Sequence, residues 1–294
     1  MVKDHMYLMR CLLAALWAAK EAGLAILDVY QQDFDVSYKE DRSPLTIADQ
    51  RSHRIIVDYL TDSIGENIPI LSEEGKDVPF EERREWEYFW LIDPLDGTKE
   101  FIKKNGEFTV NIALIHQTRA ILGVIYAPAI NVFYFASEGL GAYRLNRDDA
   151  FVLFEERITQ NKRADILKAI LEQSDRLPNP APRPENCPPQ LTIIGSRSHS
   201  SDEFKDFVKD MKKKHAKVEL ISAGSSLKLC LVAERRADIY PRLGPTMEWD
   251  TAAGQAIVEQ ARGSVLNYET GEPLIYNKED LLNPWFIVKS QGNL

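Results

Sequence analysis

One short stretch constrains both the fold and the chemistry of this chain, because an apolar run leads directly into a turn that carries acids. It reads Phe89-Trp90-Leu91-Ile92-Asp93-Pro94-Leu95-Asp96-Gly97-Thr98. The first four residues are typical of a buried strand, and the Asp-Pro and Asp-Gly pairs that follow favour turns. Two carboxylates three residues apart are therefore predicted to lie just past a strand end.

Asp93 and Asp96 are suited to a hard cation at this turn. Mg²⁺ prefers oxygen ligands in octahedral geometry, and the backbone carbonyl between the two acids can supply another ligand. Gly97 and Thr98 add backbone N–H groups with little steric cover, which can hold a phosphate. Asp-Pro and Asp-Gly are also common in ordinary loops, so the choice between a site and a turn depends on the rest of the chain.

Composition limits the classes of function. A chain of 294 residues with 44% hydrophobic residues suits one large domain or two closely packed lobes. The net charge of −9 argues against binding a nucleic-acid polymer through a broad basic surface. Small anions stay compatible with an acidic chain if metal ions neutralise the acids. Cys11, Cys187 and Cys230 have no spacing typical of a zinc site or a disulfide framework, which favours the cytoplasm.

The N-terminal stretch 6–27 is apolar except for Arg10, Lys20 and Glu21. Its uncharged run 11–19 is too short to span a bilayer. The residues before it carry mixed charges rather than the basic start of a signal peptide. We therefore expect an amphipathic helix that ends at about Tyr30, which leaves room for peripheral contact with the cytoplasmic face of the inner membrane.

Two more acidic positions precede the central turn. Asp49 follows the break at Ser43-Pro44 and stands at the start of a predicted helix, where Thr46 or Asp49 could be a simple cap. Glu73-Glu74 follow a short predicted strand over 68–71, and adjacent acids before a glycine are usually solvated. Neither position identifies a function alone.

The order of the predicted elements indicates an α/β fold. Consecutive strands over 108–116, 120–127 and 132–136 predict an antiparallel meander. A charged helical stretch and a proline-rich segment, together spanning about 155–190, are predicted to connect two lobes, 1–155 and 156–294. Strands and helices alternate in the second lobe, which favours layering. Its candidate binding residues are Ser196, His199, Ser225, Lys228, Tyr240 and Arg242. The alternatives are that Ser225 caps a helix, that Lys228 is solvated and that Tyr240 belongs to the core.

Glu73-Glu74 after a strand, Asp93-x-x-Asp96-Gly97-Thr98 and Trp249-Asp250 at a helix start resemble, in this order, the signature of the inositol monophosphatase superfamily of metal-dependent, lithium-sensitive phosphatases. The resemblance covers nearly the whole chain. Five segments are more similar to the 3′(2′),5′-bisphosphate nucleotidases of that superfamily, namely 43–49, 71–74, 195–199, 224–228 and 240–246. The implied fold is a layered αβαβα sandwich of the inositol monophosphatase and fructose-1,6-bisphosphatase type, with metals between the lobes. The proline-rich connection is longer than the resemblance predicts.

The resemblance also implies a role for each candidate. One Mg²⁺ would be held by Glu73, Asp93 and the Leu95 carbonyl, a second by Asp93, Asp96 and Asp250, and a weaker third would lie near Glu73. Asp49 and Thr98 would position and help deprotonate the attacking water, with Glu73 as the third candidate catalytic residue. Gly97 and Thr98 would bind phosphate. The six candidates of the second lobe would contact a nucleotide.

The implied reaction is removal of the 3′-phosphate of 3′-phosphoadenosine 5′-phosphate, or of its phosphosulfate relative, in sulfur assimilation. Hydrolysing a phosphomonoester requires an activated water, charge neutralisation and a stabilised leaving group, and two divalent ions can supply all three. No Ser or Cys nucleophile with a partnered His is apparent, which favours direct attack by water. An inositol or sugar phosphatase of the same fold would share the metal ligands. A metal-binding protein without catalytic activity would be expected to have lost one of these metal ligands. A monomer and a homodimer are both compatible with the sequence.

Overall fold

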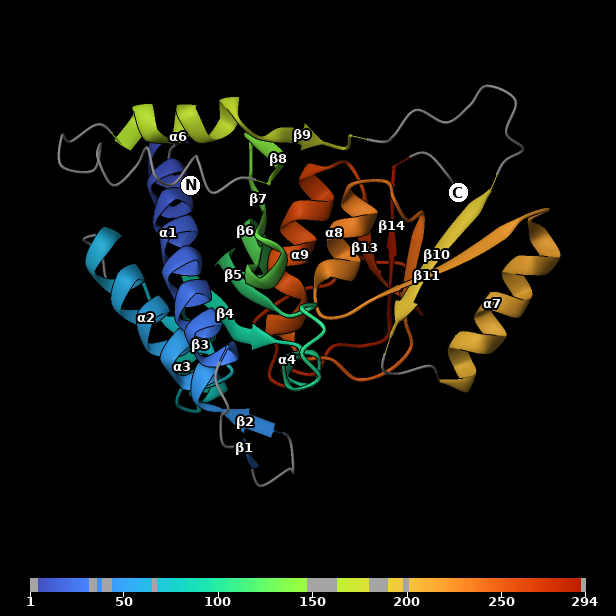
Figure 1. Ribbon diagram of the computed structural model, residues 1–294, viewed down its shortest axis with the longest axis horizontal. Helices are drawn as coiled ribbons and strands as arrows, with labels where there is room; N and C mark the ends of the chain where they lie inside the picture. The colour runs from blue at the N-terminus through green and yellow to red at the C-terminus, as the bar shows by residue number, and fades with distance from the viewer. Residues whose placement is uncertain are drawn as a thin grey trace.

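The structure is a computed structural model that describes residues 5–31, 36–38, 44–64, 68–146, 163–179, 190–197 and 201–291. Two sheets organise it, as Figure 1 shows. The larger sheet has the order β3-β4-β5-β6-β7-β8-β9 and the smaller has the order β11-β10-β12-β14-β13. A separate hairpin joins β1 (Val36–Tyr38) and β2 (Pro44–Thr46).

The larger sheet is antiparallel except for its first pair, β3 and β4. Its strands are β3 (Ile70–Ser72), β4 (Tyr88–Asp96), β5 (Thr109–His116), β6 (Arg119–Ala127), β7 (Val132–Ser137), β8 (Gly141–Leu145) and β9 (Asp175–Leu177). The 3₁₀ turn η1 (Pro128–Ile130) joins β6 to β7. The antiparallel meander predicted over 108–136 is therefore confirmed.

Both faces of this sheet are buried, which explains why its strands are apolar throughout. Successive strand residues point to opposite faces, so Trp90 and Ile92 pack with α1 (His5–Tyr30) and α2 (Ile47–Ile64). Phe89 and Leu91 pack on the other face, in a core shared with the helices α8 (Leu227–Ala233) and α9 (Glu248–Gln260). The predicted end of the first helix at Tyr30 is confirmed.

The apolar character of α1 is accounted for by this packing, because most of its apolar residues are buried against the sheet, α2 and α6 (Arg163–Glu172). Met6 and Leu24 are exposed, with exposed fractions of 61% and 47%, and Met9, Ala25, Leu27 and Tyr30 are half-buried. Within the described ranges, no helix combines the length and hydropathy that a membrane crossing requires.

The smaller sheet consists of β10 (Leu191–Ser196), β11 (Val218–Ala223), β12 (Ile239–Arg242), β13 (Ser264–Asn267) and β14 (Phe286–Lys289). β10 pairs in parallel with β11 and β12, whereas β14 is antiparallel to both of its neighbours. The helix α7 (Asp202–Lys214) lies on its outer side in Figure 1.

Helices α8 and α9 stand between the two sheets, so the predicted layered α/β fold is confirmed. Close contact fixes α9 in place: a Cβ on Gly123 of β6 would lie 2.3 Å from the carbonyl oxygen of Ala253. Only glycine permits this approach of helix to strand. The division into lobes at residue 155 stays a prediction, and α6 and β9, which follow it in the chain, belong with the larger sheet.

Candidate active site

The central acidic stretch does not end its strand where the sequence predicted. Strand β4 continues through Asp93 to Asp96, and a bulge lies between them. Asp93 pairs with Asn111 and Asp96 with Thr109, so three residue steps on β4 oppose two on β5. A bulge of this kind kinks a strand and re-aims its side chains. The prediction of a strand end at Ile92 was wrong, because backbone pairing resumes at Asp96.

Local contacts hold the bulge in shape. The Asp93 carboxylate accepts a hydrogen bond from the Leu95 N–H at 3.1 Å, and the Ser52 hydroxyl of α2 donates to the Pro94 carbonyl at 2.7 Å. Gly97 follows with φ of +90°, a value that favours glycine, and caps the short helix α4 (Thr98–Ile102). The turn therefore presents the Gly97–Thr98 backbone beside the acids.

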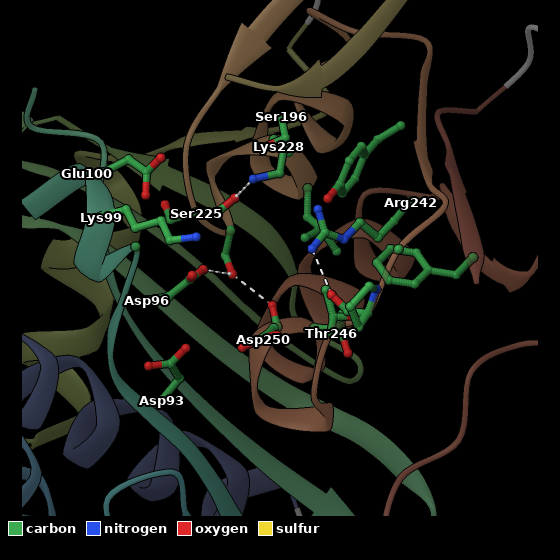
Figure 2. A pocket seen from close by; sticks show the side chains of 18 of the residues that line it. Asp93, Asp96, Lys99, Glu100, Ser196, Ser225, Lys228, Arg242, Thr246 and Asp250 are labelled. Carbon is green, nitrogen blue, oxygen red and sulfur yellow. Dashed lines mark hydrogen bonds between the residues drawn. The ribbon is translucent and has the colours of Figure 1, made fainter. Parts of the chain in front are cut away.

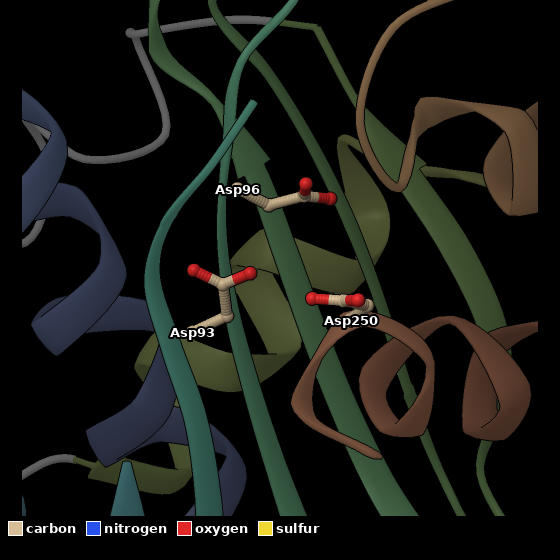
Figure 3. A group of neighbouring side chains, drawn as sticks. All are labelled: Asp93, Asp96 and Asp250. Atoms are coloured by element: carbon tan, nitrogen blue, oxygen red, sulfur yellow. The ribbon is translucent and has the colours of Figure 1, made fainter. Parts of the chain in front are cut away.

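Asp250 joins these acids from the first turn of α9, where its carboxylate accepts the Met247 N–H at 2.8 Å. One ligand oxygen from each of Asp93, Asp96 and Asp250 lies within 4.8 Å of the other two. Figure 3 shows the three carboxylates converging from β4 and α9. The structure thus brings together residues that are more than 150 positions apart in the chain.

The pKa of each of the three carboxylates is raised, first of all by burial. Burial, followed by the negative charges of Glu73, Asp96, Asp250 and Asp49, raises the pKa of Asp93 well above its ordinary value. Burial and Asp96 raise the pKa of Asp250 to about 7. Burial also raises the pKa of Asp96, although Lys228 and Ser226 oppose the shift. A bound cation would favour the ionised form of all three carboxylates, and an all-oxygen donor set fits a hard divalent ion.

Glu73 and Asp49 lie near this cluster without belonging to it. Glu73 is exposed just after β3, lines the same cavity, and donates its N–H to the Ile92 carbonyl at 3.2 Å. Asp49 is buried in the first turn of α2. Both lie close enough for their charges to raise the pKa of Asp93.

Two polar residues that the sequence analysis missed connect the acids. The Ser226 Oγ lies 2.8 Å from both the Asp96 carboxylate and the Asp250 carbonyl, and accepts a hydrogen bond from the Asn111 side chain at 2.9 Å. Asn111 stands out in the sequence as a polar residue in the apolar run 108–116. Ser226 was part of a segment singled out there, but nothing in that segment distinguished it from Ser225.

The acids form one side of a cavity of about 800 Å³. Its lining includes most of the predicted site residues, namely Glu73, Asp93, Leu95, Asp96, Gly97, Thr98, Ser196, Ser225, Lys228, Tyr240, Arg242 and Asp250. Asp49 is buried outside the lining, and the predicted His199 lies outside the described residues. Lys99 and Glu100 also line the cavity, and Figure 2 shows the Lys99 side chain pointing between Asp96 and Ser225.

Two basic residues, Lys228 and Arg242, line the side of the cavity away from Asp93. Lys228 is buried in α8, donates to the Ser225 carbonyl, and has its Nζ 5.6 Å from the centre of the Tyr240 ring. Burial lowers its pKa to about 8; Asp96 opposes this shift and Arg242 adds to it. Arg242 ends β12 and donates to the Pro245 carbonyl at 2.7 Å (Figure 2). Lys228 is therefore not the solvated residue of the alternative interpretation.

The simpler alternatives, a core position for Tyr240 and a helix cap for Ser225, do not fully describe these two residues. Tyr240 is buried, with its ring edge-on to Phe286 at 5.9 Å, and it also lines the cavity, so it is both a core and a pocket residue. Ser225 does not cap α8, because Ser226 holds the N-cap position. The Ser225 Oγ lines the cavity and is buried without a hydrogen-bond partner among the described residues.

A buried hydrogen-bond network holds the start of α9, the helix that carries Asp250. Glu248, at the start of α9, is fully buried and accepts the N–H groups of Asn277 and Lys278 at 2.6 and 3.0 Å, and the Lys278 ammonium at 2.5 Å. Arg83 of α3 (Phe80–Arg83) donates to Asn277 at 3.0 Å and to the carbonyl of Glu279 at 2.8 Å. These bonds connect the start of α9 to the segment that follows Glu73.

Comparison with known proteins identifies the family and the fold. The family model described as "Inositol monophosphatase family" matches residues 9–292. The chain is 43% identical over 274 residues to the 3′(2′),5′-bisphosphate nucleotidase CysQ of Shigella flexneri, covering 92% of this chain and 96% of that protein. The crystal structure of CysQ from Bacteroides thetaiotaomicron, a bacterial member of the inositol monophosphatase family, superposes with a TM-score of 0.83 and 46% identity over 98% of this chain and all of that one. The extragenic suppressor protein suhB from Bartonella henselae shares the fold, with a TM-score of 0.67 and 24% identity over 95% of this chain and 92% of that one.

Proposed function

The chain belongs to the inositol monophosphatase family, and from this membership we propose that it is a 3′(2′),5′-bisphosphate nucleotidase that removes the 3′-phosphate of 3′-phosphoadenosine 5′-phosphate. Its relatives that are 42–43% identical over 92% of the chain carry this activity in their names. The observation that carries the proposal is a cavity with acids on one side and, on the other, the buried Lys228 and the half-buried Arg242.

We infer that Mg²⁺ is the cofactor, with Asp93, Asp96 and Asp250 as the central ligands and with Glu73 and the Leu95 carbonyl completing a second site. Bound divalent ions would neutralise phosphoryl charge and lower the pKa of water. The chain's own contribution is to orient these groups: the β4 bulge aims two acids, and the Ser226 hydroxyl holds Asp96 against the start of α9.

Thr98 and Asp49 are proposed to position the attacking water and to accept its proton. Thr98 lines the cavity beside Gly97, and Asp49 is close enough to Asp93 to raise its pKa. The exposed backbone at Gly97 and Thr98 is proposed to hold the scissile phosphate. A water in this position attacks phosphorus directly, so no covalent enzyme intermediate is required.

Substrate selection is assigned to the cations. Phosphate pairs well with Lys and Arg, and Lys228 and Arg242 line the cavity on the side away from Asp93. We propose that they bind the second phosphate, that Ser196 and Ser225 add hydroxyl contacts, and that Tyr240 borders the base; His199 stays a prediction. The proposed location is the cytoplasm, and peripheral membrane contact and the choice between monomer and homodimer stay predictions.

The test is phosphate release with Mg²⁺ from equal concentrations of 3′-phosphoadenosine 5′-phosphate, inositol 1-phosphate and fructose 1,6-bisphosphate, with Asp93→Asn as the inactive control. We expect the nucleotide to be preferred by orders of magnitude. A preference for inositol 1-phosphate would leave the metal ligands in place and refute the roles of Lys228 and Arg242. Retained turnover by Asp93→Asn would refute the metal site itself.

A further inference from the structure

An ion pair that lies outside the cavity, between Glu107 and Arg197, joins the two sides of the cavity. Glu107 follows α4, and Arg197 follows β10, on the other sheet. The Arg197 guanidinium donates to the Glu107 carboxylate through two bonds, Nε to Oε2 at 2.8 Å and Nη2 to Oε1 at 2.7 Å. These bonds raise the pKa of Arg197 above its ordinary value. Paired bonds in this geometry fix orientation as well as distance.

Glu107 also holds the segment that carries Ser225 and Lys228. Its Oε2 accepts the Gly224 N–H at 2.8 Å, and a Cβ on Gly224 would lie 2.7 Å from the Glu107 carbonyl oxygen. Arg197 adds a bond to the Ser222 carbonyl at 3.1 Å, within β11 and two residues before Gly224. The pair therefore holds the β11 end of the turn between β11 and α8 at two points.

The same contact reaches the turn beside the acids. A Cβ on Gly97 would lie 3.2 Å from the Glu107 carbonyl oxygen and 3.3 Å from the Ser225 Cβ. The backbones at Gly97, Glu107 and Ser225 are thus packed directly against one another. A shift of Glu107 would change the distance between the Gly97–Thr98 backbone and the Lys228 side.

Ser225 requires such support. Its φ is +44°, a left-handed conformation that is strained for a residue with a side chain. Its Oγ is buried in the cavity lining without a hydrogen-bond partner among the described residues. A strained residue with an unsatisfied hydroxyl keeps this conformation only if its neighbours impose it, and the Gly224 N–H bond to Glu107 does so directly before it.

We propose that Glu107 and Arg197 are positioning residues that fix the separation between the scissile-phosphate turn and the second-phosphate side, and so make the enzyme selective for substrates with two phosphates. This inference rests on the proposed function. Neither residue lines the cavity, so they act through the turns they hold. A substrate with one phosphate needs only the acidic side, and its hydrolysis is expected to be insensitive to the pair.

The experiment compares 3′-phosphoadenosine 5′-phosphate with adenosine 3′-monophosphate as substrates of the full chain with saturating Mg²⁺. The variants are Arg197→Met, Glu107→Gln and the conservative Arg197→Lys. The matched control is Arg119→Met, which removes the 3.2 Å ion pair between the exposed Arg119 of β6 and Glu138, the residue after β7. Melting temperatures are measured for all variants.

For Arg197→Met we expect KM for the bisphosphate to rise on the order of tenfold with kcat nearly unchanged, because misplacing a binding group by less than 1 Å is enough for such a loss. The monophosphate parameters should change less than about twofold. Glu107→Gln should have the same effects as Arg197→Met, and Arg197→Lys should recover part of the loss. Arg119→Met should leave KM and kcat unchanged for both substrates.

Equal losses on both substrates would overturn the proposal and make the pair a purely structural brace. Unchanged discrimination in Arg197→Met and Glu107→Gln would overturn it as well. A wild-type enzyme that does not prefer the bisphosphate would refute both this inference and the proposed nucleotidase function. A wild-type enzyme that prefers it, together with variants that prefer it equally, would refute only the positioning role.

Discussion

The two sides of the cavity suit ligands of opposite charge. On the acidic side, Asp93, Asp96 and Asp250 lie close together, and burial raises the pKa of each, with Asp96 adding to the shifts of Asp93 and Asp250. On the basic side, burial and the neighbouring Arg242 lower the pKa of Lys228, Asp96 opposes the shift, and the resulting pKa is about 8. The acidic side therefore suits a cation, and the basic side suits an anion.

This difference indicates what each side recognises. Carboxylates that share a buried site ionise together only when a metal neutralises them. A buried lysine beside an arginine gains most from a ligand with two negative charges, such as a phosphate. We therefore propose that the acidic side serves the reaction and the basic side the choice of substrate, and changes on the two sides should be separable by measurement.

The largest effect is expected from Asp93→Asn. It removes a ligand charge while the amide oxygen can still accept the Leu95 N–H, so the bulge should persist. Losing metal-based charge stabilisation of several kcal/mol should lower kcat by at least about a thousandfold for every substrate. Initial rates with both the bisphosphate and adenosine 3′-monophosphate test this, with Asp28→Asn, in the exposed Arg51–Asp28 pair, as control. A loss confined to the bisphosphate would contradict the division between the sides.

The sequence indicated that Asp93, Asp96 and Asp250 belong together, and the structure confirms that they cluster. Asp93 and Asp96 are three residues apart in the chain, and Asp250 lies in the first turn of a helix, so local patterns and one resemblance sufficed to group them. The bulge itself was missed, since Pro94 argues for a strand end while the β5 register restores pairing at Asp96. Backbone pairing between distant strands is not encoded in the local pattern.

The residues that link segments could not be predicted in the same way. Ser226 bonds to Asp96 and to α9, and Glu107 bonds to Arg197 and Gly224, across separations of 24 to 130 positions. Glu248 resembles any acid in a first helical turn, and only the structure reveals that it is fully buried. Such partners follow from the packing of the sheets, which a single sequence does not specify.

A smaller but selective effect is expected from Arg242→Gln. Removing a charge that binds phosphate typically costs a few kcal/mol, so KM for the bisphosphate should rise about a hundredfold. Adenosine 3′-monophosphate should be hydrolysed almost normally, because the acidic side is intact. Steady-state kinetics on both substrates measure the difference. If Arg242→Gln lost both activities equally, the basic side would have to be counted as part of the reaction site.

Metal binding should stabilise the folded chain through the acidic side alone. Mg²⁺ at a hundred times its dissociation constant should raise the free energy of unfolding by about 2.7 kcal/mol, visible as a higher melting temperature at constant ionic strength. Arg242→Gln should keep this increase, and Asp250→Asn should lose most of it. An equal increase in wild type and Asp250→Asn would place the stabilising ion elsewhere.

The smallest effect concerns pH and separates the two sides without changing the metal ligands. Lys228 is cationic below its pKa of about 8 and neutral above it, so its charge is lost as the pH rises from 7 to 9. The ratio of kcat/KM for the bisphosphate to that for adenosine 3′-monophosphate should therefore fall by about tenfold over this range, because kcat/KM reports groups of the free enzyme. Taking the ratio cancels titrations that both substrates share, including those of the acidic side. Lys228→Arg should keep its charge and flatten the ratio, since arginine does not lose its proton in this range. A ratio that falls equally in wild type and in Lys228→Arg would show that another group on the basic side titrates, and that Lys228 does not contact the second phosphate.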